Sequence, residues 1–227
     1  MPKGKFIAIE GTDGSGKATH LNLVVEKLRA AGRPVEVLDF PQYGQKSAGA
    51  VEEYLNGKYG SAQEVSPYVA SLFYAVDRFD ASFKIRTALA AEKIVLANRY
   101  MPANIAYQGA KIADPQERQK FLFWVEELEY GMMKIPRPDL VLFLHVPAKI
   151  SFELVAKKTA RAYLQTGKTR DIHETDRNYQ KAVEQSYIEL AAHDATIKTI
   201  DCAPGGELLP IDKINQLIMQ QIYALLV

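Results

Sequence analysis

Short apolar runs alternate with longer amphipathic segments along this 227-residue chain. Near-continuous apolar runs are typical of strands buried on both faces of a parallel sheet. The clearest are residues 6–9, 94–97 and 139–144, residues 35–38 and 196–200 are two further predicted strands, and segments with apolar residues at helical spacing separate the five. This alternation predicts an α/β fold in three layers, with a five-stranded parallel sheet between two layers of helices and right-handed crossovers.

The longest predicted helix begins at Ser66-Pro67, where serine is a good N-cap and proline suits the first turn. Asp77 and Arg78 stand within its apolar pattern, which leaves two interpretations: they form an ion pair with each other, or they serve a site. We expect its apolar side chains to face the core: Val69, Leu72, Phe73, Val76, Phe79 and Phe83.

Composition favours one domain spanning residues 1–227, since 48% of the residues are hydrophobic and a second full domain would need a longer chain. The 28 basic and 27 acidic residues leave a net charge of +1, so we expect no nucleic-acid or anionic-membrane partner. We also expect no signal segment and no membrane span. The single cysteine, Cys202, cannot form an internal disulfide, and a cytoplasmic location is the prediction.

Residues 11–17, GTDGSGK, join the first predicted strand to the first predicted helix. This pattern is typical of a P-loop, in which backbone N–H groups and a helix N-terminus bind phosphates while Lys17 reaches the outer phosphates. A plain glycine-rich turn is the alternative, and the strand before and helix after make it the weaker one. The full motif has Ser or Thr after the lysine to bind magnesium. Here Ala18 takes that place and Thr19 follows.

Polar and aromatic residues follow two other predicted strands, at the sheet edge where α/β proteins bind ligands. Residues 39–44 contain Phe40 and Tyr43, which either contact a ligand or cover the sheet edge, and residues 98–100 contain Arg99. A P-loop with separate arginines suggests two phosphorylated ligands and phosphoryl transfer between nucleotides.

A basic segment lies at residues 157–171, with five basic residues and one acidic residue. A solvated charge run is one explanation, and a lid that surrounds phosphates is the other. Its cations are Lys157, Lys158, Arg161, Lys168 and Arg170.

Over nearly its whole length the chain resembles the thymidylate kinases. The matching motifs are 10–17 (EGTDGSGK), 40–44 (FPQYG), 72–78 (LFYAVDR), 98–108 (NRY through Asn104 to YQ) and 171–174 (DIHE), in the family's order and spacing. The resemblance implies a P-loop kinase fold with a lid, and phosphorylation of dTMP to dTDP with ATP and Mg²⁺. It also implies a homodimer.

Residue roles come from the same resemblance. It implies an ATP site formed by Gly11, Thr12, Asp13, Gly14, Ser15, Gly16, Lys17, Ala18 and Thr19. It implies a dTMP site formed by Asp13, Phe40, Pro41, Tyr43, Tyr74, Arg78, Arg99, Tyr100, Asn104, Tyr107 and Gln108. The implied catalytic residues are Lys17, Asp13, Arg99, Arg161, Lys168 and Arg170, with Asp13 also placed at the metal.

Within the implied dTMP site, Arg99 binds the monophosphate and Tyr74 stacks on thymine. Arg78 and Asn104 meet the polar edge of the base, and Tyr107 lies under the deoxyribose. Some members have an arginine where this chain has Gly14, so the resemblance implies that its catalytic cations come from the lid.

The chain departs from the family pattern at Ala18, Asn98, Ala103 and His145. Without a hydroxyl at Ala18 or a carboxylate at Asn98, magnesium depends on Asp13, water and the substrates. Two other functions stay open: another nucleoside monophosphate or deoxynucleoside kinase, and a nucleotide-binding regulator that has lost turnover.

Overall fold

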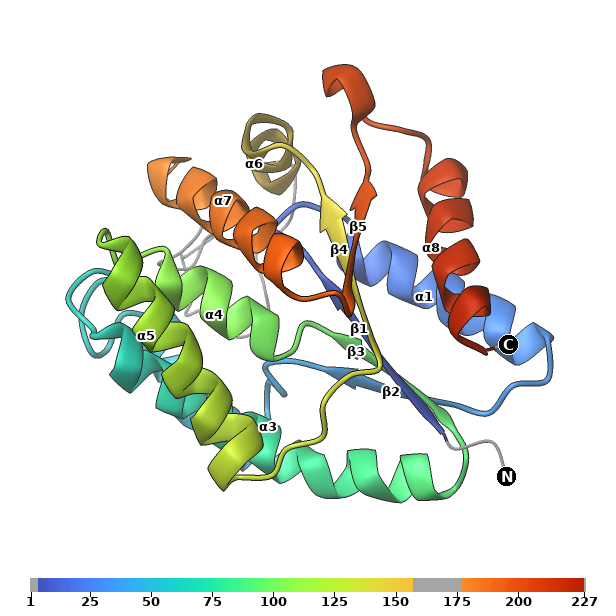
Figure 1. Ribbon diagram of the computed structural model, residues 1–227, viewed down its shortest axis with the longest axis horizontal. Helices are drawn as coiled ribbons and strands as arrows, with labels where there is room; N and C mark the ends of the chain where they lie inside the picture. The colour runs from blue at the N-terminus through green and yellow to red at the C-terminus, as the bar shows by residue number, and fades with distance from the viewer. Residues whose placement is uncertain (1–3, 157–176, 227) are drawn as a thin grey trace.

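The computed structural model describes residues 4–156 and 177–226. Five parallel strands form one sheet in the order β2-β3-β1-β4-β5 (Figure 1). They are β1 (Lys5–Glu10), β2 (Val35–Asp39), β3 (Ile94–Asn98), β4 (Leu140–His145) and β5 (Ile197–Asp201). The predicted α/β fold is therefore confirmed. The lid expected at 157–171 lies outside the described residues, and so do Lys158, Arg161, Lys168 and Arg170.

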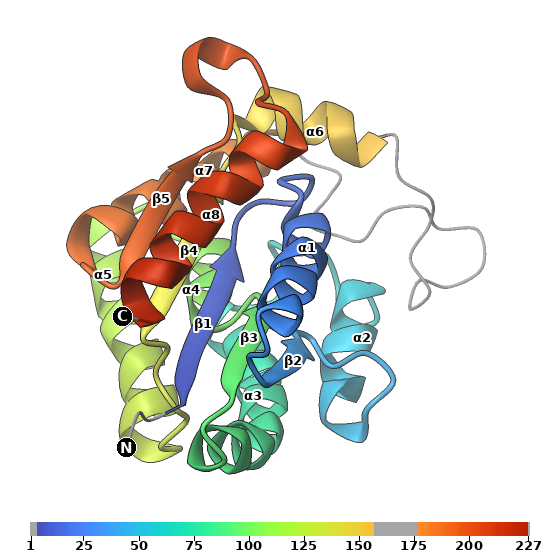
Figure 2. The same ribbon diagram turned by 90° about the vertical axis from the view of Figure 1, so that its right-hand side faces the viewer.

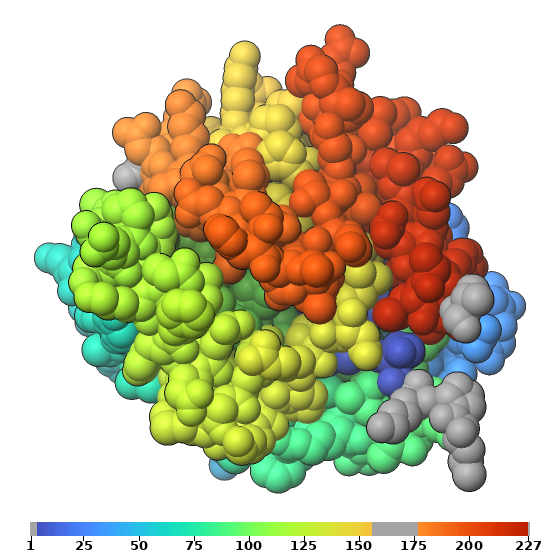
Figure 3. Space-filling view, in the orientation of Figure 1, coloured from blue at the N-terminus to red at the C-terminus, as the bar shows by residue number. Residues whose placement is uncertain are grey.

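Helices cover both faces of the sheet (Figures 1 and 2). One face carries α1 (Lys17–Ala30) and α8 (Ile211–Leu226), and the other carries α3 (Pro67–Ala90), α4 (Met101–Gly109), α5 (Pro115–Glu126) and α7 (Arg177–His193). The short helices are α2 (Gly49–Leu55) and α6 (Ala148–Ala156), and a π-helical turn, η2 (Glu127–Met132), follows α5. The space-filling view shows α5, α7 and α8 over the side turned to the reader (Figure 3).

Alternate residues of β1, the central strand, pack into two separate hydrophobic cores. Phe6 and Ala8 of β1 pack toward α3, α4 and α7, while Ile7 and Ile9 pack toward α1 and α8. Because both faces are buried, the strand has no polar face, which is why its sequence is a continuous apolar run. No helix in residues 4–156 or 177–226 is long and apolar enough to cross a membrane.

The expected orientation of α3 is wrong. Most of its large apolar side chains are exposed, and Phe73 is half-buried. The buried face instead carries small residues, which allow close helix packing, together with Asp77 and Arg78. The exposed apolar residues are Val69 (44%), Leu72 (40%), Val76 (50%), Phe79 (40%) and Phe83 (60%).

Asp77 and Arg78 do not pair with each other, so the first of the two interpretations, a local ion pair, is wrong. The Asp77 carboxylate accepts hydrogen bonds from the Gln42 backbone N–H at 2.9 Å and from the Ser47 hydroxyl at 2.9 Å. Arg78 pairs with Glu129, 51 positions along the chain. Each charge on the buried face of α3 therefore has a partner on another segment, and Asp77 fixes the loop after β2.

Candidate active site

The P-loop connects β1 to α1 through two glycines in the left-handed region, Gly14 (φ 88°) and Gly16 (φ 83°). Glycine suits these angles because it has no Cβ to clash with the backbone. A Cβ at Gly14 would also collide with the Ser151 carbonyl of α6, so this position has no room for a side chain. The Lys17 ammonium is buried and donates to the Gly11 and Thr12 carbonyls at 3.0 and 2.8 Å.

A pocket of about 1300 Å³ opens over this loop, and we call it the donor pocket. Seven of the nine residues expected at ATP, positions 13–19, line it; Gly11 and Thr12 contribute through the carbonyls that hold Lys17. The pocket also has an apolar wall that no sequence motif indicated, formed by Val146, Leu154, Leu208, Leu209, Ile211 and Ile214.

The ends of β2 and β3 meet at the rim of the donor pocket. Asp39 and Asn98 are register partners, and the Asn98 amide N–H donates to the Asp39 carboxylate at 2.8 Å. Asn98 Oδ1 is buried and has no hydrogen-bond partner. Across residues 4–156 and 177–226, no three His, Cys, Asp or Glu side chains gather as a metal site. Among the described residues, the oxygens available to a metal ion are therefore isolated and do not form a complete set of ligands.

A second pocket of about 510 Å³ adjoins the first, and we call it the acceptor pocket. The two pockets share Asp13, Phe40, Tyr43 and Arg99. All eleven residues expected at dTMP line the acceptor pocket, and Leu55 and Ala103 complete its wall. Phe40 is buried as well as pocket-lining, so it both covers the sheet edge and faces the site.

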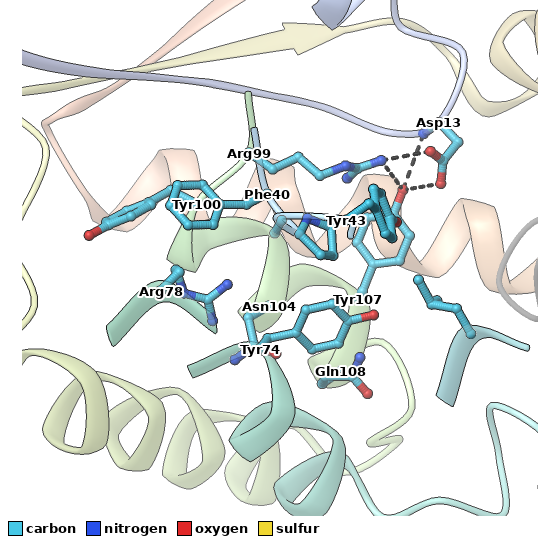
Figure 4. A pocket seen from close by; sticks show the side chains of 13 residues that line it. Asp13, Phe40, Tyr43, Tyr74, Arg78, Arg99, Tyr100, Asn104, Tyr107 and Gln108 are labelled. Atoms are coloured by element: carbon cyan, nitrogen blue, oxygen red, sulfur yellow. Dashed lines mark hydrogen bonds and ion pairs between the residues drawn. The ribbon is translucent and has the colours of Figure 1, made fainter. Parts of the chain in front are cut away.

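Asp13 stands between the two pockets and is held by two side chains (Figure 4). Arg99 Nη2 lies 2.6 Å from Asp13 Oδ1, and the Tyr107 hydroxyl donates to Asp13 Oδ2 at 2.6 Å. Burial raises the pKa of the Tyr107 phenol, so the hydroxyl keeps its proton and remains a donor. Arg99 is also in the left-handed region, at φ 65°, a strained backbone conformation that is enriched at functional sites.

Arg78 and Asn104 lie at the other end of the acceptor pocket, away from Asp13 (Figure 4). Arg78 Nε and Nη2 each donate to the Glu129 carboxylate at 2.6 Å, and Asn104 Nδ2 donates to Glu129 Oε1 at 3.2 Å. Asn104 Oδ1 is buried without a hydrogen-bond partner, as are both polar atoms of the Gln108 side chain. These unpaired amide groups line a cavity, so a ligand can satisfy them.

Glu10, at the end of β1, holds the residues around Arg99 in place through hydrogen bonds. Its carboxylate accepts hydrogen bonds from the Tyr100 and Ala103 backbone N–H groups at 2.6 and 3.3 Å and from the Tyr187 hydroxyl at 2.8 Å. Complete burial raises the pKa of Glu10. The turn that carries Arg99 is therefore tied to β1 and to α7. Neither Glu10 nor Glu129 was expected among the site residues: Glu10 stands in the P-loop motif without an implied role, and an isolated glutamate such as Glu129 gives no signal in a sequence.

A phosphate-binding loop and an arginine-containing second pocket that meet at Asp13 define a P-loop kinase acting on two nucleotides. The family model for thymidylate kinase matches residues 9–209. The chain belongs to the thymidylate kinase family. It is an ATP-dependent dTMP kinase, a phosphotransferase that forms dTDP.

Similar proteins support this membership. The thymidylate kinase of Mycobacterium tuberculosis is 35% identical over 188 residues, which cover 82% of this chain and 86% of the relative. That of Latilactobacillus sakei is 30% identical over 220 residues, covering 96% and 95%. The solved structure of thymidylate kinase from Candida albicans matches with a TM-score of 0.75 at 24% identity, covering 98% of this chain and 92% of that one. At that identity the structural match supports the fold alone.

Proposed function

We propose that dTMP occupies the acceptor pocket, with its 5′-phosphate at Arg99 and its thymine at Arg78 and Asn104. The observation that carries this proposal is the placement of two arginines in one pocket. Arg99 lies beside Asp13 and the P-loop, and Arg78 lies at the far end (Figure 4). An arginine fork suits a phosphate at the first position, next to the donor pocket, where the phosphoryl group must arrive.

The far end of the pocket suits the polar edge of thymine. Glu129 occupies Nε–H and one N–H of Nη2 of Arg78, so the remaining N–H groups, two of them on Nη1, can donate to the thymine O4 carbonyl. Asn104 Oδ1 can accept from the ring N3–H. Cytosine presents an amino group and a bare ring nitrogen at these places, and each buried group left unpaired costs about 1–3 kcal/mol.

Two aromatic residues complete the proposed acceptor site. Tyr74 lines the pocket where its ring can stack on the base, and the ring of Tyr107, held by Asp13, can lie under the sugar. The bulk of Tyr107 would then exclude a ribose 2′-hydroxyl.

ATP would place its phosphates on the P-loop and its adenine against the apolar wall of the donor pocket. Lys17 would exchange its bonds to the Gly11 and Thr12 carbonyls for phosphate oxygens. The cations Arg161, Lys168 and Arg170 would surround the transferring group. Alanine at these three positions should lower kcat rather than raise KM, because charge moves toward the bridging oxygen in the transition state; an unchanged kcat would reduce the segment to a solvated loop.

Magnesium belongs to the same proposal, and the residues present fit an ion that keeps most of its water. Asp13 already bonds to Arg99 and Tyr107, while Asn98 Oδ1 is a buried unpaired acceptor beside Asp39. Asp13, Asp39 and Asn98 would hold Mg²⁺ mainly through its water shell. When bound, the ion neutralises charge on the phosphate oxygens.

A homodimer that pairs the exposed face of α3 with a second copy is also part of the proposal. Positions 69, 72, 76, 79 and 83 recur at alternating steps of three and four, the spacing of a helix-to-helix seam. Light scattering should give a dimer for the parent and a monomer for Val76→Asp with Phe79→Asp. Tyr223→Asp, at an equally exposed aromatic residue of α8, should stay dimeric. A monomeric parent would contradict the proposed dimer.

A cytoplasmic location of the protein stays a prediction.

The base contacts can be tested with Asn104→Leu and Arg78→Lys. The first is nearly isosteric but lacks the acceptor, and the second keeps a charge for Glu129 but lacks the Nη1 donor. In each, the ratio of kcat/KM for dTMP to that for dCMP should fall roughly tenfold or more. The matched control is Arg86→Lys, about two turns further along α3 at a residue outside the pocket. Unchanged ratios in both test variants would contradict this placement of the base.

A further inference from the structure

Glu129 is a buried carboxylate that lines neither pocket and yet holds two residues that line one. It lies in the π-helical turn η2, with no exposed surface. Its two oxygens receive three hydrogen bonds, two from Arg78 at 2.6 Å and one from Asn104 at 3.2 Å. One side chain therefore controls both groups at the far end of the acceptor pocket.

An ionised carboxylate can only accept hydrogen bonds, and this decides how Asn104 is turned. The asparagine amide has two orientations that differ by exchange of its oxygen and nitrogen. Nδ2 faces the Glu129 carboxylate at 3.2 Å and lies at the longer distance of 3.5 Å from the Ser71 carbonyl, and both groups only accept, so Oδ1 is left without a partner. The same carboxylate takes Nε–H and one N–H of Nη2 of Arg78, which leaves three N–H donors, two of them on Nη1.

We propose that Glu129 is a positioning residue that sets the order of donor and acceptor in the acceptor pocket. It thereby selects bases that carry a carbonyl beside a ring N–H and rejects bases that carry an amino group beside a bare ring nitrogen. This inference rests on the proposed placement of thymine at Arg78 and Asn104. It assigns the choice between keto and amino bases to a residue that does not touch the substrate.

A purely structural role for Glu129 makes a different prediction. The pair between Glu129 and Arg78 joins η2 to α3, and a residue that only held these elements together would affect all acceptors alike. A positioning residue changes the relative use of dTMP and dCMP. The ratio of the two kcat/KM values is therefore the decisive quantity.

The test is Glu129→Gln, which adds an N–H group where only acceptors stood. The new amide can donate to Asn104 Oδ1. We expect this bond to outweigh the longer contact of Nδ2 with the Ser71 carbonyl, so that the Asn104 amide turns over and presents Nδ2 to the base. This N–H then opposes the N3–H of thymine but suits the bare N3 of cytosine. The ratio of kcat/KM for dTMP to that for dCMP should fall by roughly ten- to hundredfold, mainly through loss of dTMP turnover.

Glu184→Gln is the matched control, since Glu184 is a partly buried carboxylate that accepts from His145 and from the Ala148 backbone N–H. In Glu184→Gln the ratio of kcat/KM for dTMP to that for dCMP should equal the parent's ratio. Glu129→Asp guards against misfolding of the glutamine variant: it keeps an acceptor-only group, so it should keep the preference for dTMP even if its kcat/KM falls for both substrates. Thermal unfolding verifies that each variant is folded.

Two results would overturn the proposal: a folded Glu129→Gln with the parent's ratio, or a folded Glu129→Asp that loses the preference. Failure of the underlying placement is recognised separately. If Asn104→Leu and Arg78→Lys also leave the ratio unchanged, the base does not lie at these residues. If those two variants change the ratio and Glu129→Gln does not, the placement stands and only the role of Glu129 falls.

Discussion

The two pockets meet at Asp13 but are built in different ways. In the donor pocket, Lys17 is held by carbonyls five and six positions earlier in the chain. In the acceptor pocket, Arg78 is held by a residue 51 positions away, and Asp13 by residues 86 and 94 positions away. The phosphate-binding loop of the donor pocket is thus a local backbone structure, whereas the polar groups of the acceptor pocket are held by side chains that only the complete fold brings together.

Because of this difference, we expect the donor pocket to govern the rate of turnover and the acceptor pocket to govern which substrate is used. Backbone N–H groups and one lysine bind any triphosphate, so changes there should alter turnover. Buried side-chain donors and acceptors match one base and penalise another, so changes in the acceptor pocket should alter which substrate is used.

The largest effect is expected at Lys17. Lys17→Ala removes the cation nearest the transferring phosphates and should lower kcat by roughly 10³-fold or more. The preference for dTMP over dCMP should stay that of the parent, because the acceptor pocket is intact. Steady-state kinetics with both acceptors measures this, and Lys27→Ala in the same helix serves as control. A folded Lys17→Ala with near-normal kcat would refute the role.

A moderate effect is expected at the magnesium positions. Asn98→Asp would place a second carboxylate beside Asp39, and Ala18→Thr would add a hydroxyl at the start of α1. Each should lower the magnesium concentration that gives half-maximal activity by a few-fold, because hard oxygen ligands hold the ion. Activity is titrated with MgCl₂ at fixed ATP. If both variants give the parent's curve, neither position lies near the ion.

The smallest expected effect is a pH dependence of the free energy of unfolding, caused by Lys111, which contacts residues next to the acceptor pocket. Lys111 donates to the Tyr54 hydroxyl and the Val65 carbonyl, and the Tyr54 ring contacts Tyr74. Burial lowers the pKa of Lys111 to about 8, against about 10.4 in an unfolded chain. Between these values the folded state binds fewer protons than the unfolded state, so the free energy of unfolding rises with pH.

This contribution should disappear in Lys111→Met and persist in Lys198→Met, at an exposed lysine of β5. The measurement is urea unfolding between pH 7.5 and 10.5. Burial also raises the pKa of Cys202 to about 12, which opposes the rise at high pH but does so equally in all three proteins. Parallel curves for the parent and Lys111→Met would show that the Lys111 ammonium is not perturbed.

Much of the fold could be predicted because its signals are local. All five strands and the P-loop appear as runs of neighbouring residues, and the structure has each near its expected position. The orientation of α3 could not be predicted in this way. Periodicity shows that a helix has an apolar face, but it does not say whether this chain or another molecule covers that face.

Position after a strand indicated only Phe40, Tyr43 and Arg99 of the acceptor pocket, and its other residues came from resemblance to known proteins. Its eleven expected residues do line one cavity, although composition and spacing alone could not have gathered them. Glu10, Asp39 and Glu129 were missed for a physical reason. Each acts through hydrogen bonds to distant segments, and these do not show in a sequence whether the residue stands in a motif, as Glu10 does, or alone, as Glu129 does.

The most direct test of the central claim, that buried side chains of the acceptor pocket choose the substrate, is kcat/KM for dTMP, dUMP, dCMP and UMP with ATP and magnesium. We predict dTMP first and dUMP next, because the missing methyl group costs only about 1–3 kcal/mol. We predict dCMP far behind, owing to the reversed donor and acceptor, and UMP excluded by the bulk of Tyr107. Equal kcat/KM values for dTMP and either dCMP or UMP would contradict this claim.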